Sequence, residues 1–186
     1  MNPLERAMKW ARSVLMLHPV FVDTETTGLG EGAEVVEIAV VGLEGETIYH
    51  SLVCPVEPMG ESAAEINGIS LDELALAPPW YRVWWELRPI LWDRLAVAHN
   101  AAFDRRVIEQ SCRRAGEEPP ACGWECTCEA LKAANGGHWP RLSVAAELAG
   151  ARESTERHRA LADAHTVRRI VLALAEREDL LLGGAA

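Results

Sequence analysis

The sequence contains no uninterrupted apolar run that approaches the ~20 residues needed to cross a membrane as a helix. Its first residues, Met1 to Arg6, also lack the continuous apolar stretch and the small-residue cleavage site of a secretory signal peptide. We therefore expect no association with a membrane and a location in the cytoplasm.

Basic residues are in the minority. The chain has 18 Lys and Arg against 28 Asp and Glu, so its formal net charge is −10. A protein that coats nucleic acid is expected to be basic, and the charge argues against this class. It does not argue against an enzyme that grips nucleic acid locally with the help of bound cations.

Cysteine is scarce as well. The chain has five cysteines, an odd number that favours a reducing compartment over a disulfide framework. Cys122, Cys126 and Cys128, with His138 ten residues further on, invite a zinc interpretation. The spacing does not match the usual pairs of a structural zinc site, so ordinary reduced thiols are the favoured interpretation.

The length and composition fit one domain. The chain has 186 residues, of which 49% are apolar and 25% charged, and this is enough to bury a core. We see no internal repeat, low-complexity segment or interdomain linker. We therefore expect a single domain over 1–186, with an N-terminal helical extension at 1–18 and a catalytic core at 19–182.

Hydrophobic periodicity predicts an alternation of strands and helices. Three strands joined by short loops, at 20–25, 35–41 and 47–53, indicate an antiparallel meander. A fourth, short strand is expected at 95–98. Helices are expected at 3–16, from Pro78-Pro79 onward, at 101–115, 128–134, 142–149 and 159–182. The order predicts an α/β fold around one mixed sheet flanked by helices.

Four tryptophans fall in or just after the helix that starts at Pro78-Pro79. They are Trp80, Trp84, Trp85 and Trp92. Such a cluster could stack on nucleic-acid bases. The helical spacing of the apolar residues favours core packing instead. Pro89 is expected to kink or end this helix.

Two acids stand at the end of the first strand, in Val22-Asp23-Thr24-Glu25-Thr26-Thr27-Gly28. Residues i and i+2 of a strand project to the same face, so the carboxylates of Asp23 and Glu25 point to one place. Two neighbouring acids repel each other and resist burial, and a fold that holds them there usually supplies cations. Mg²⁺ and Mn²⁺ are the expected ions. The alternative is a strand end that is simply acidic and solvated.

Two further acids are candidates only in combination with this pair. Asp104 lies at the start of the helix that follows strand 95–98, where the helix dipole favours a carboxylate without any function. Asp163 follows His158 by five residues, about 500° of helical rotation, so the two cannot share a helix face. They can meet only if His158 lies on the loop before the helix. Taken singly, each could be an ordinary surface residue.

Taken together, these motifs resemble the DEDDh 3′→5′ exonucleases, the family of the proofreading epsilon subunit of bacterial replicases. The motifs are Asp23-Thr24-Glu25, His99-Asn100-Ala101-Ala102-Phe103-Asp104 and His158-Arg159-Ala160-Leu161-Ala162-Asp163. Ribonuclease T and oligoribonuclease share the catalytic pattern. The likeness covers about Val20 to Leu174, nearly the whole chain.

The resemblance implies a ribonuclease H-like fold and a two-metal mechanism. It assigns the metal-binding acids to Asp23, Glu25, Asp104 and Asp163, and the general base to His158. Two cations ~3.5–4 Å apart can hold the attacking and leaving oxygens of an in-line displacement. A neutral histidine within hydrogen-bond reach can take the proton of the attacking water.

The resemblance also implies which residues hold the terminal nucleotide. It points to Thr24 and to the segment Thr26, Thr27, Gly28 and Leu29, with Leu29 pressed against the base. His99, Asn100 and Phe103 are weaker candidates. Alternatively, Phe103 could belong to the core, and Asn100 could serve merely as the cap of the following helix.

The predicted function is the release of nucleoside monophosphates from single-stranded DNA 3′ ends, in proofreading or repair. The implied partners are a single-stranded nucleic-acid 3′ end and a DNA polymerase subunit. Two alternatives stay open: an exoribonuclease that trims short RNA 3′ ends, and a non-catalytic module of the same fold that binds nucleic acid or a polymerase. Sugar selectivity depends on contacts to the 2′-hydroxyl, which the sequence does not reveal.

Overall fold

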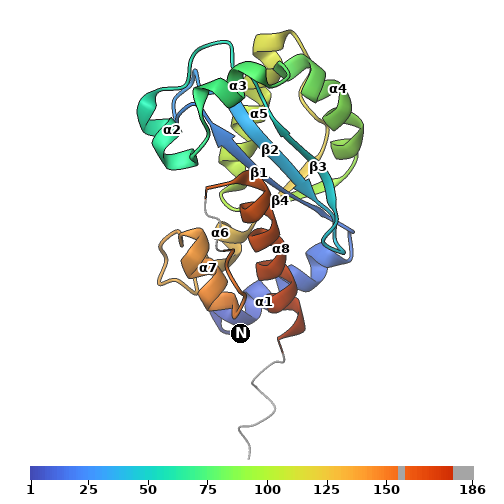
Figure 1. Ribbon diagram of the computed structural model, residues 1–186. Coiled ribbons are helices and arrows are strands. Elements are labelled where there is room, and N and C mark those ends of the chain that lie inside the picture. The colour runs from blue at the N-terminus through green and yellow to red at the C-terminus, as the bar shows by residue number, and fades with distance from the viewer. Residues whose placement is uncertain (155–157, 178–186) are drawn as a thin grey trace, which may run out of the picture.

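The structure is a computed structural model that describes residues 1–154 and 158–177 (Figure 1). Its elements, in chain order, are α1 (Pro3–Leu15), β1 (Val20–Thr26), β2 (Val35–Val41), β3 (Thr47–Leu52), α2 (Glu61–Asn67), α3 (Leu71–Leu76), α4 (Trp80–Leu91), β4 (Leu95–Ala98), α5 (Ala101–Ala115), β5 (Gly123–Cys126), α6 (Thr127–Lys132), α7 (Leu142–Ala149) and α8 (Ala160–Glu176).

The five strands form one mixed sheet in the order β3-β2-β1-β4-β5. Strands β1, β2 and β3 pair antiparallel, which confirms the predicted meander. Strand β4 pairs in parallel with β1, and β5 pairs in parallel with β4. This places β1, the strand that carries Asp23 and Glu25, in the middle of the sheet.

Helices cover both faces of the sheet (Figure 1). On one face α1, α7 and α8 bury their apolar residues against Phe21, Ala39 and Val97. On the other face α4 and α5 pack against Val22 and Val40. Because side chains alternate along β1, Asp23 and Glu25 share the face of Phe21, the face that α8 covers.

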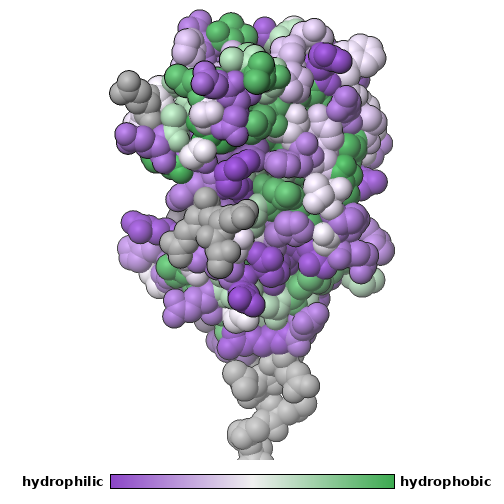
Figure 2. Space-filling view, in the orientation of Figure 1, coloured by the Kyte–Doolittle hydropathy of each residue, from purple (hydrophilic) through white to green (hydrophobic). Residues whose placement is uncertain are grey.

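The short helices α2 and α3 lie at the end of β1. Asn67, the last residue of α2, donates a hydrogen bond from Nδ2 to the carbonyl oxygen of Thr26 at 3.1 Å. Figure 2 shows a mostly hydrophilic surface on the side that carries α8, with hydrophobic side chains gathered above it in the region of α2 and α3. The exposed apolar residues of that region are Val56, Ile66, Leu71 and Leu76.

Several predicted boundaries need correction. Strand β3 ends at Leu52, one residue earlier than predicted. Strand β5 and helix α2 are not expected from the sequence. The helix expected at 128–134 is Thr127–Lys132. The last helix ends at Glu176, not at residue 182, and residues 178–182, including the end of the expected catalytic core, lie outside the described residues.

The four tryptophans in α4 and directly after it divide into two pairs. Trp80 and Trp84 are buried, with ring centroids 5.8 Å apart, so core packing is confirmed for them. Trp85 is 73% exposed and Trp92 is 43% exposed, so the expectation is wrong for these two. Pro89 lies in the last turn of α4, which ends two residues later at Leu91.

Candidate active site

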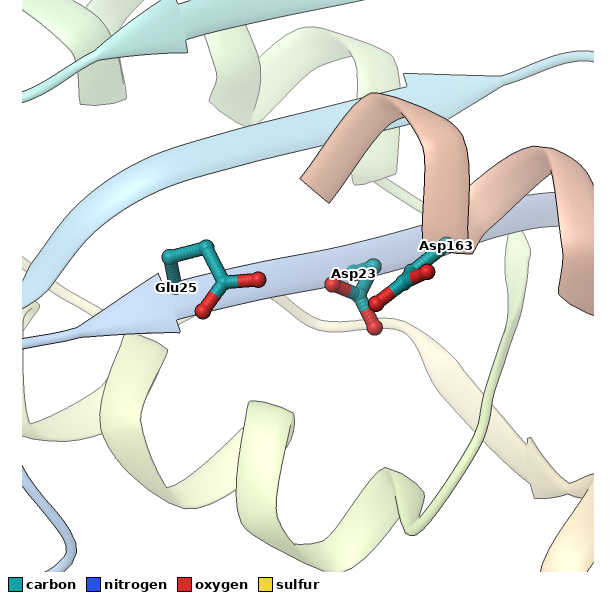
Figure 3. A group of neighbouring side chains, drawn as sticks. All are labelled: Asp23, Glu25 and Asp163. Atoms are coloured by element: carbon teal, nitrogen blue, oxygen red, sulfur yellow. The ribbon is translucent and has the colours of Figure 1, made fainter. Parts of the chain in front are cut away.

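Three carboxylates meet at the centre of the sheet. Asp23 and Glu25 come from β1 and Asp163 comes from the first turn of α8. One oxygen from each of the three carboxylates lies within 4.8 Å of the others. Figure 3 shows the carboxylates of Asp23 and Asp163 facing each other, with Glu25 further along the strand.

The packing of α8 brings Asp163 to this place. The helix lies across β1 and β2 and buries Ala160, Ala164 and Val167 in the same core as Phe21. Asp163 lies in the first turn of this helix, where the helix dipole favours a negative charge.

Asp104 reaches the site from the opposite side of β1. It lies in the first turn of α5 and is 3% exposed. Its Oδ1 accepts a hydrogen bond from the Thr24 hydroxyl at 2.8 Å, and Thr24 points to the face of β1 that α5 covers. Asp104 is therefore close to Asp23 but outside the group of three carboxylates.

His158 lies on the chain just before α8, and Asp163 lies within the helix. This is the arrangement that lets the two residues serve one site. The backbone of His158 is left-handed, with φ at 57°, and the residue is exposed. An exposed histidine just before α8 is accessible to solvent and to a substrate.

The electrostatics of the cluster oppose ionisation. Burial, followed by repulsion from Asp104, Asp163, Glu25 and Glu37, raises the pKa of Asp23 well above its usual value. Burial and the neighbouring acids raise the pKa of Glu25 to about 8. Burial raises the pKa of Asp104 to about 7, although its hydrogen bond from Thr24 acts in the opposite direction.

Comparison with known proteins identifies the family. The exonuclease family model matches residues 20–171, most of the chain. The chain belongs to the exonuclease family. Among curated relatives, an uncharacterized exonuclease of Escherichia phage 186 is 32% identical, with 98% of this chain and 95% of that protein covered. A PolC-type DNA polymerase III from Staphylococcus haemolyticus is 30% identical over 95% of this chain, which spans only 12% of that polymerase.

Solved structures agree with this assignment. Exonuclease X in complex with 5′ overhanging duplex DNA is 26% identical, with a TM-score of 0.65, and the match covers 83% of this chain and 89% of that one. A 3′-exonuclease that recognises a histone mRNA stem-loop has a TM-score of 0.73 at 16% identity, with 86% of this chain and 64% of that one covered, and shows the shared fold. With its motifs, the chain is a DEDDh 3′→5′ exonuclease with a ribonuclease H-like fold.

The donor set of this exonuclease fits divalent cations, which the family implies. Hard cations such as Mg²⁺ and Mn²⁺ prefer carboxylate oxygens, and the three convergent carboxylates offer only such oxygens. Bound cations would also offset the repulsion that raises the pKa values of Asp23 and Glu25.

This repulsion predicts how the stability of the metal-free exonuclease depends on pH. The folded protein holds a proton on Glu25 that the unfolded chain releases above pH 4.5, so stability falls as pH rises from about 4.5 to about 8. Glu25→Gln removes this loss. A single pKa unit is worth about 1.4 kcal/mol, or about 3–6 °C in melting temperature for a chain of this length, so we expect the melting temperature of Glu25→Gln in EDTA at pH 8 to exceed that of the unmodified chain by at least this much.

Thermal melts between pH 5 and 8, with EDTA or Mn²⁺, check this expectation. Mn²⁺ should stabilise the unmodified chain at pH 8 more than Glu25→Gln. A melting temperature of the unmodified chain in EDTA that stays constant across this pH range would contradict the assigned repulsion.

The segment proposed to hold the terminal nucleotide is fixed at both ends of its turn. The Thr26 hydroxyl donates to the carbonyl oxygen of Gly28 at 2.7 Å. The Thr27 hydroxyl accepts from the backbone N–H of Glu34 at 3.0 Å, and the Thr27 N–H donates back to the Glu34 carbonyl. Leu29, 80% exposed, is left at the surface of this loop and free to contact a base.

Side chains of α5 hold the rest of that loop. Arg106, Gln110 and Arg114 stand one turn apart and donate to the carbonyl oxygens that follow Gly28. The carbonyls belong to Leu29, Gly30, Glu31 and Gly32. The helix that carries Asp104 therefore also sets the position of Leu29.

The remaining substrate candidates are placed differently. The His99 ring points toward α6, with Nδ1 2.8 Å from the Thr127 hydroxyl and Nε2 3.0 Å from the carbonyl oxygen of Pro140. Asn100 precedes α5 in a left-handed conformation, φ 70°, and its side chain makes no capping hydrogen bond, so the expected cap is wrong. Phe103 is half-buried beneath the Arg106 guanidinium, 5.2 Å from its ring centroid.

Sequence reasoning missed one polar group beside the site. Glu37 of β2 is fully buried and lies directly opposite Glu25 in the sheet. Although burial alone would raise its pKa, hydrogen bonds from His50, Arg159 and the Ala160 N–H lower the pKa to about 2. A charged residue inside the apolar run 35–41 is the signal that could have revealed it.

Proposed function

We propose that this exonuclease removes nucleoside monophosphates one at a time from the 3′ end of single-stranded DNA. The convergence of Asp23, Glu25 and Asp163 within 4.8 Å, with Asp104 close by, is the observation that carries the proposal. In this proposal the four acids bind two divalent cations, Mg²⁺ or Mn²⁺, and His158 is the general base.

The proposed chemistry divides between the cations and the chain. When bound, two cations would lower the pKa of a water molecule and stabilise the leaving 3′-oxygen. His158 accepts the proton of the attacking water, a role that histidine often fills as a general base and that the exposure of this residue just before α8 permits. The four acids would hold the cations that attract the scissile phosphate, and Leu29 packs on the last base.

A DNA substrate and a role in proofreading or repair are supported by the relatives. Exonuclease X was solved with DNA, and PolC-type polymerases contain a segment similar to nearly the whole chain. In this proposal an exonuclease of this kind acts on 3′ ends that a polymerase leaves mismatched. Association with a polymerase subunit belongs to the same proposal.

A matched assay tests the substrate. Single-stranded DNA, duplex DNA and RNA of one sequence, each labelled so that the released monophosphate can be counted, are incubated with Mg²⁺ or Mn²⁺. We expect the highest rate on single-stranded DNA, and no release in EDTA. Faster release from RNA would favour an exoribonuclease, and no release from any substrate with either cation would favour a binding module.

A further inference from the structure

Glu37 is a buried charge in the middle of the sheet. It is 0% exposed, in a strand whose seven side chains are all buried. An ionised carboxylate is costly to bury unless it is paired and hydrogen-bonded. Because Glu37 lies opposite Glu25, it is a neighbour of the acids that we propose bind the cations. Its hydrogen-bond partners therefore determine whether it can bind a cation as well.

Both oxygens of Glu37 are already engaged. Oε1 lies 2.7 Å from His50 Nε2 and 3.1 Å from Arg159 Nη2. Oε2 accepts from Arg159 Nε at 3.2 Å and from the backbone N–H of Ala160 at 3.0 Å. A carboxylate held in this way is not available as a fifth metal ligand, and it does not belong to the group of three convergent carboxylates.

The bond to Ala160 supplies a cap that α8 lacks locally. The N-cap residue of α8 is Arg159, whose side chain makes no capping hydrogen bond to the helix. Glu37 provides the acceptor instead, although it is 123 residues away in sequence. An acceptor at this position satisfies an otherwise unpaired N–H, and its negative charge suits the N-terminus of a helix.

We propose that Glu37 is a positioning residue that sets the distance between the acids of β1 and two residues at the start of α8, Asp163 in its first turn and His158 just before it. It stands opposite Glu25 on the neighbouring strand and grips the residues between His158 and Asp163. This inference rests on the proposed function, because it concerns how the proposed site is assembled.

The contacts of Glu37 with Arg159 and Ala160, here called the clamp, oppose a repulsion that arises within the site itself. The carboxylates of Asp23, Glu25 and Asp163 repel one another, so without bound cations they favour movement of α8 away from β1. The ion pair between Glu37 and Arg159 and the cap at Ala160 oppose this movement from outside the cluster. The site can then keep its spacing before a cation or substrate arrives.

Glu37→Gln tests the clamp in the full-length chain. The amide keeps the shape of the side chain but loses the charge that binds Arg159 and caps α8. Hydrogen exchange of the first turn of α8 in the metal-free protein should become faster. With saturating Mn²⁺, we expect kcat on labelled single-stranded DNA to fall by about 10–100-fold with KM nearly unchanged, as for other residues that orient metal ligands.

Glu5→Gln is the matched control. Glu5 is 9% exposed, and its carboxylate accepts from the backbone N–H and the side-chain Nδ2 of Asn2, both at 2.9 Å, in the capping box of α1. It should lose stability without a change in kcat or in the exchange of α8. An unchanged kcat in Glu37→Gln, or an equal fall of kcat in both variants, would overturn the inference.

Three further samples keep the outcomes separate. If Glu37→Gln does not fold, Arg159→Gln removes the ion pair and leaves the Glu37 carboxylate at Ala160, and a kcat equal to that of the unmodified chain then overturns the clamp. The unmodified chain and Asp23→Ala are measured in parallel. If the unmodified chain releases no nucleotide, the proposed function fails, while hydrogen exchange still tests the clamp.

Discussion

Replacing Asp23 by alanine is expected to abolish the metal-dependent release of nucleotides, with a fall in kcat of about 10³-fold or more. Asp23 lies within reach of Glu25 and Asp163, and its pKa is raised first by burial and then by repulsion from Asp104, Asp163 and Glu25. Its loss removes a ligand that Glu37, the buried acid opposite Glu25, cannot replace, because the Glu37 carboxylate is bound to Arg159 and Ala160.

The melting temperature of Asp23→Ala shows whether its activity is lost through the missing metal ligand or through unfolding. Removing one of several repelling acids should leave the metal-free melting temperature equal to or above that of the unmodified chain. The gain in melting temperature on adding Mn²⁺ should shrink. If Asp23→Ala degrades a 3′-labelled strand at the normal rate, the site lies elsewhere.

Replacing His158 is expected to lower kcat by about 10²–10⁴-fold, the usual worth of a general base. Asparagine is the better substitution, because residue 158 has a left-handed backbone that asparagine tolerates and alanine does not. His158→Asn should leave Mn²⁺ binding intact, since the acids are unchanged, and this separates it from Asp23→Ala.

His18→Asn offers a close control for this variant. His18 is also exposed and left-handed, with φ at 48°, but it precedes β1, whose opposite end carries the acids. Its substitution should have no effect on kcat. Equal rates for His158→Asn and the unmodified chain would remove the histidine from the mechanism.

The acids of β1 could be predicted as a pair because strand geometry is local. Alternation fixes the relation between Asp23 and Glu25 once the strand is recognised, and the strand follows from its apolar residues. The relation of His158 to Asp163 could also be stated as a condition on the start of the last helix. The structure places that start at Ala160, between the two residues.

Other features depend on tertiary contacts that no short pattern contains. β5 is only Gly-Trp-Glu-Cys and is recognisable as a strand through its pairing with β4. The direction of the His99 ring is set by Thr127 and Pro140, which lie on later elements. The role of Glu37 can be recognised only once α8 is known to begin beside β2, because Ala160 and Glu37 are 123 residues apart in sequence.

The packing of α1 has a consequence for synthesis. The apolar face of α1, formed by Ala7, Met8, Ala11 and Val14, is buried together with α8, and Arg12 donates to the carbonyl oxygen of Ala175. The apolar face of α1, which precedes all five strands, can therefore be covered only after α8, which follows all of them, has been synthesised. A nascent chain cannot complete this core before α8 has left the ribosome, and the proposed nuclease centre, which includes Asp163 of α8, forms in the same step.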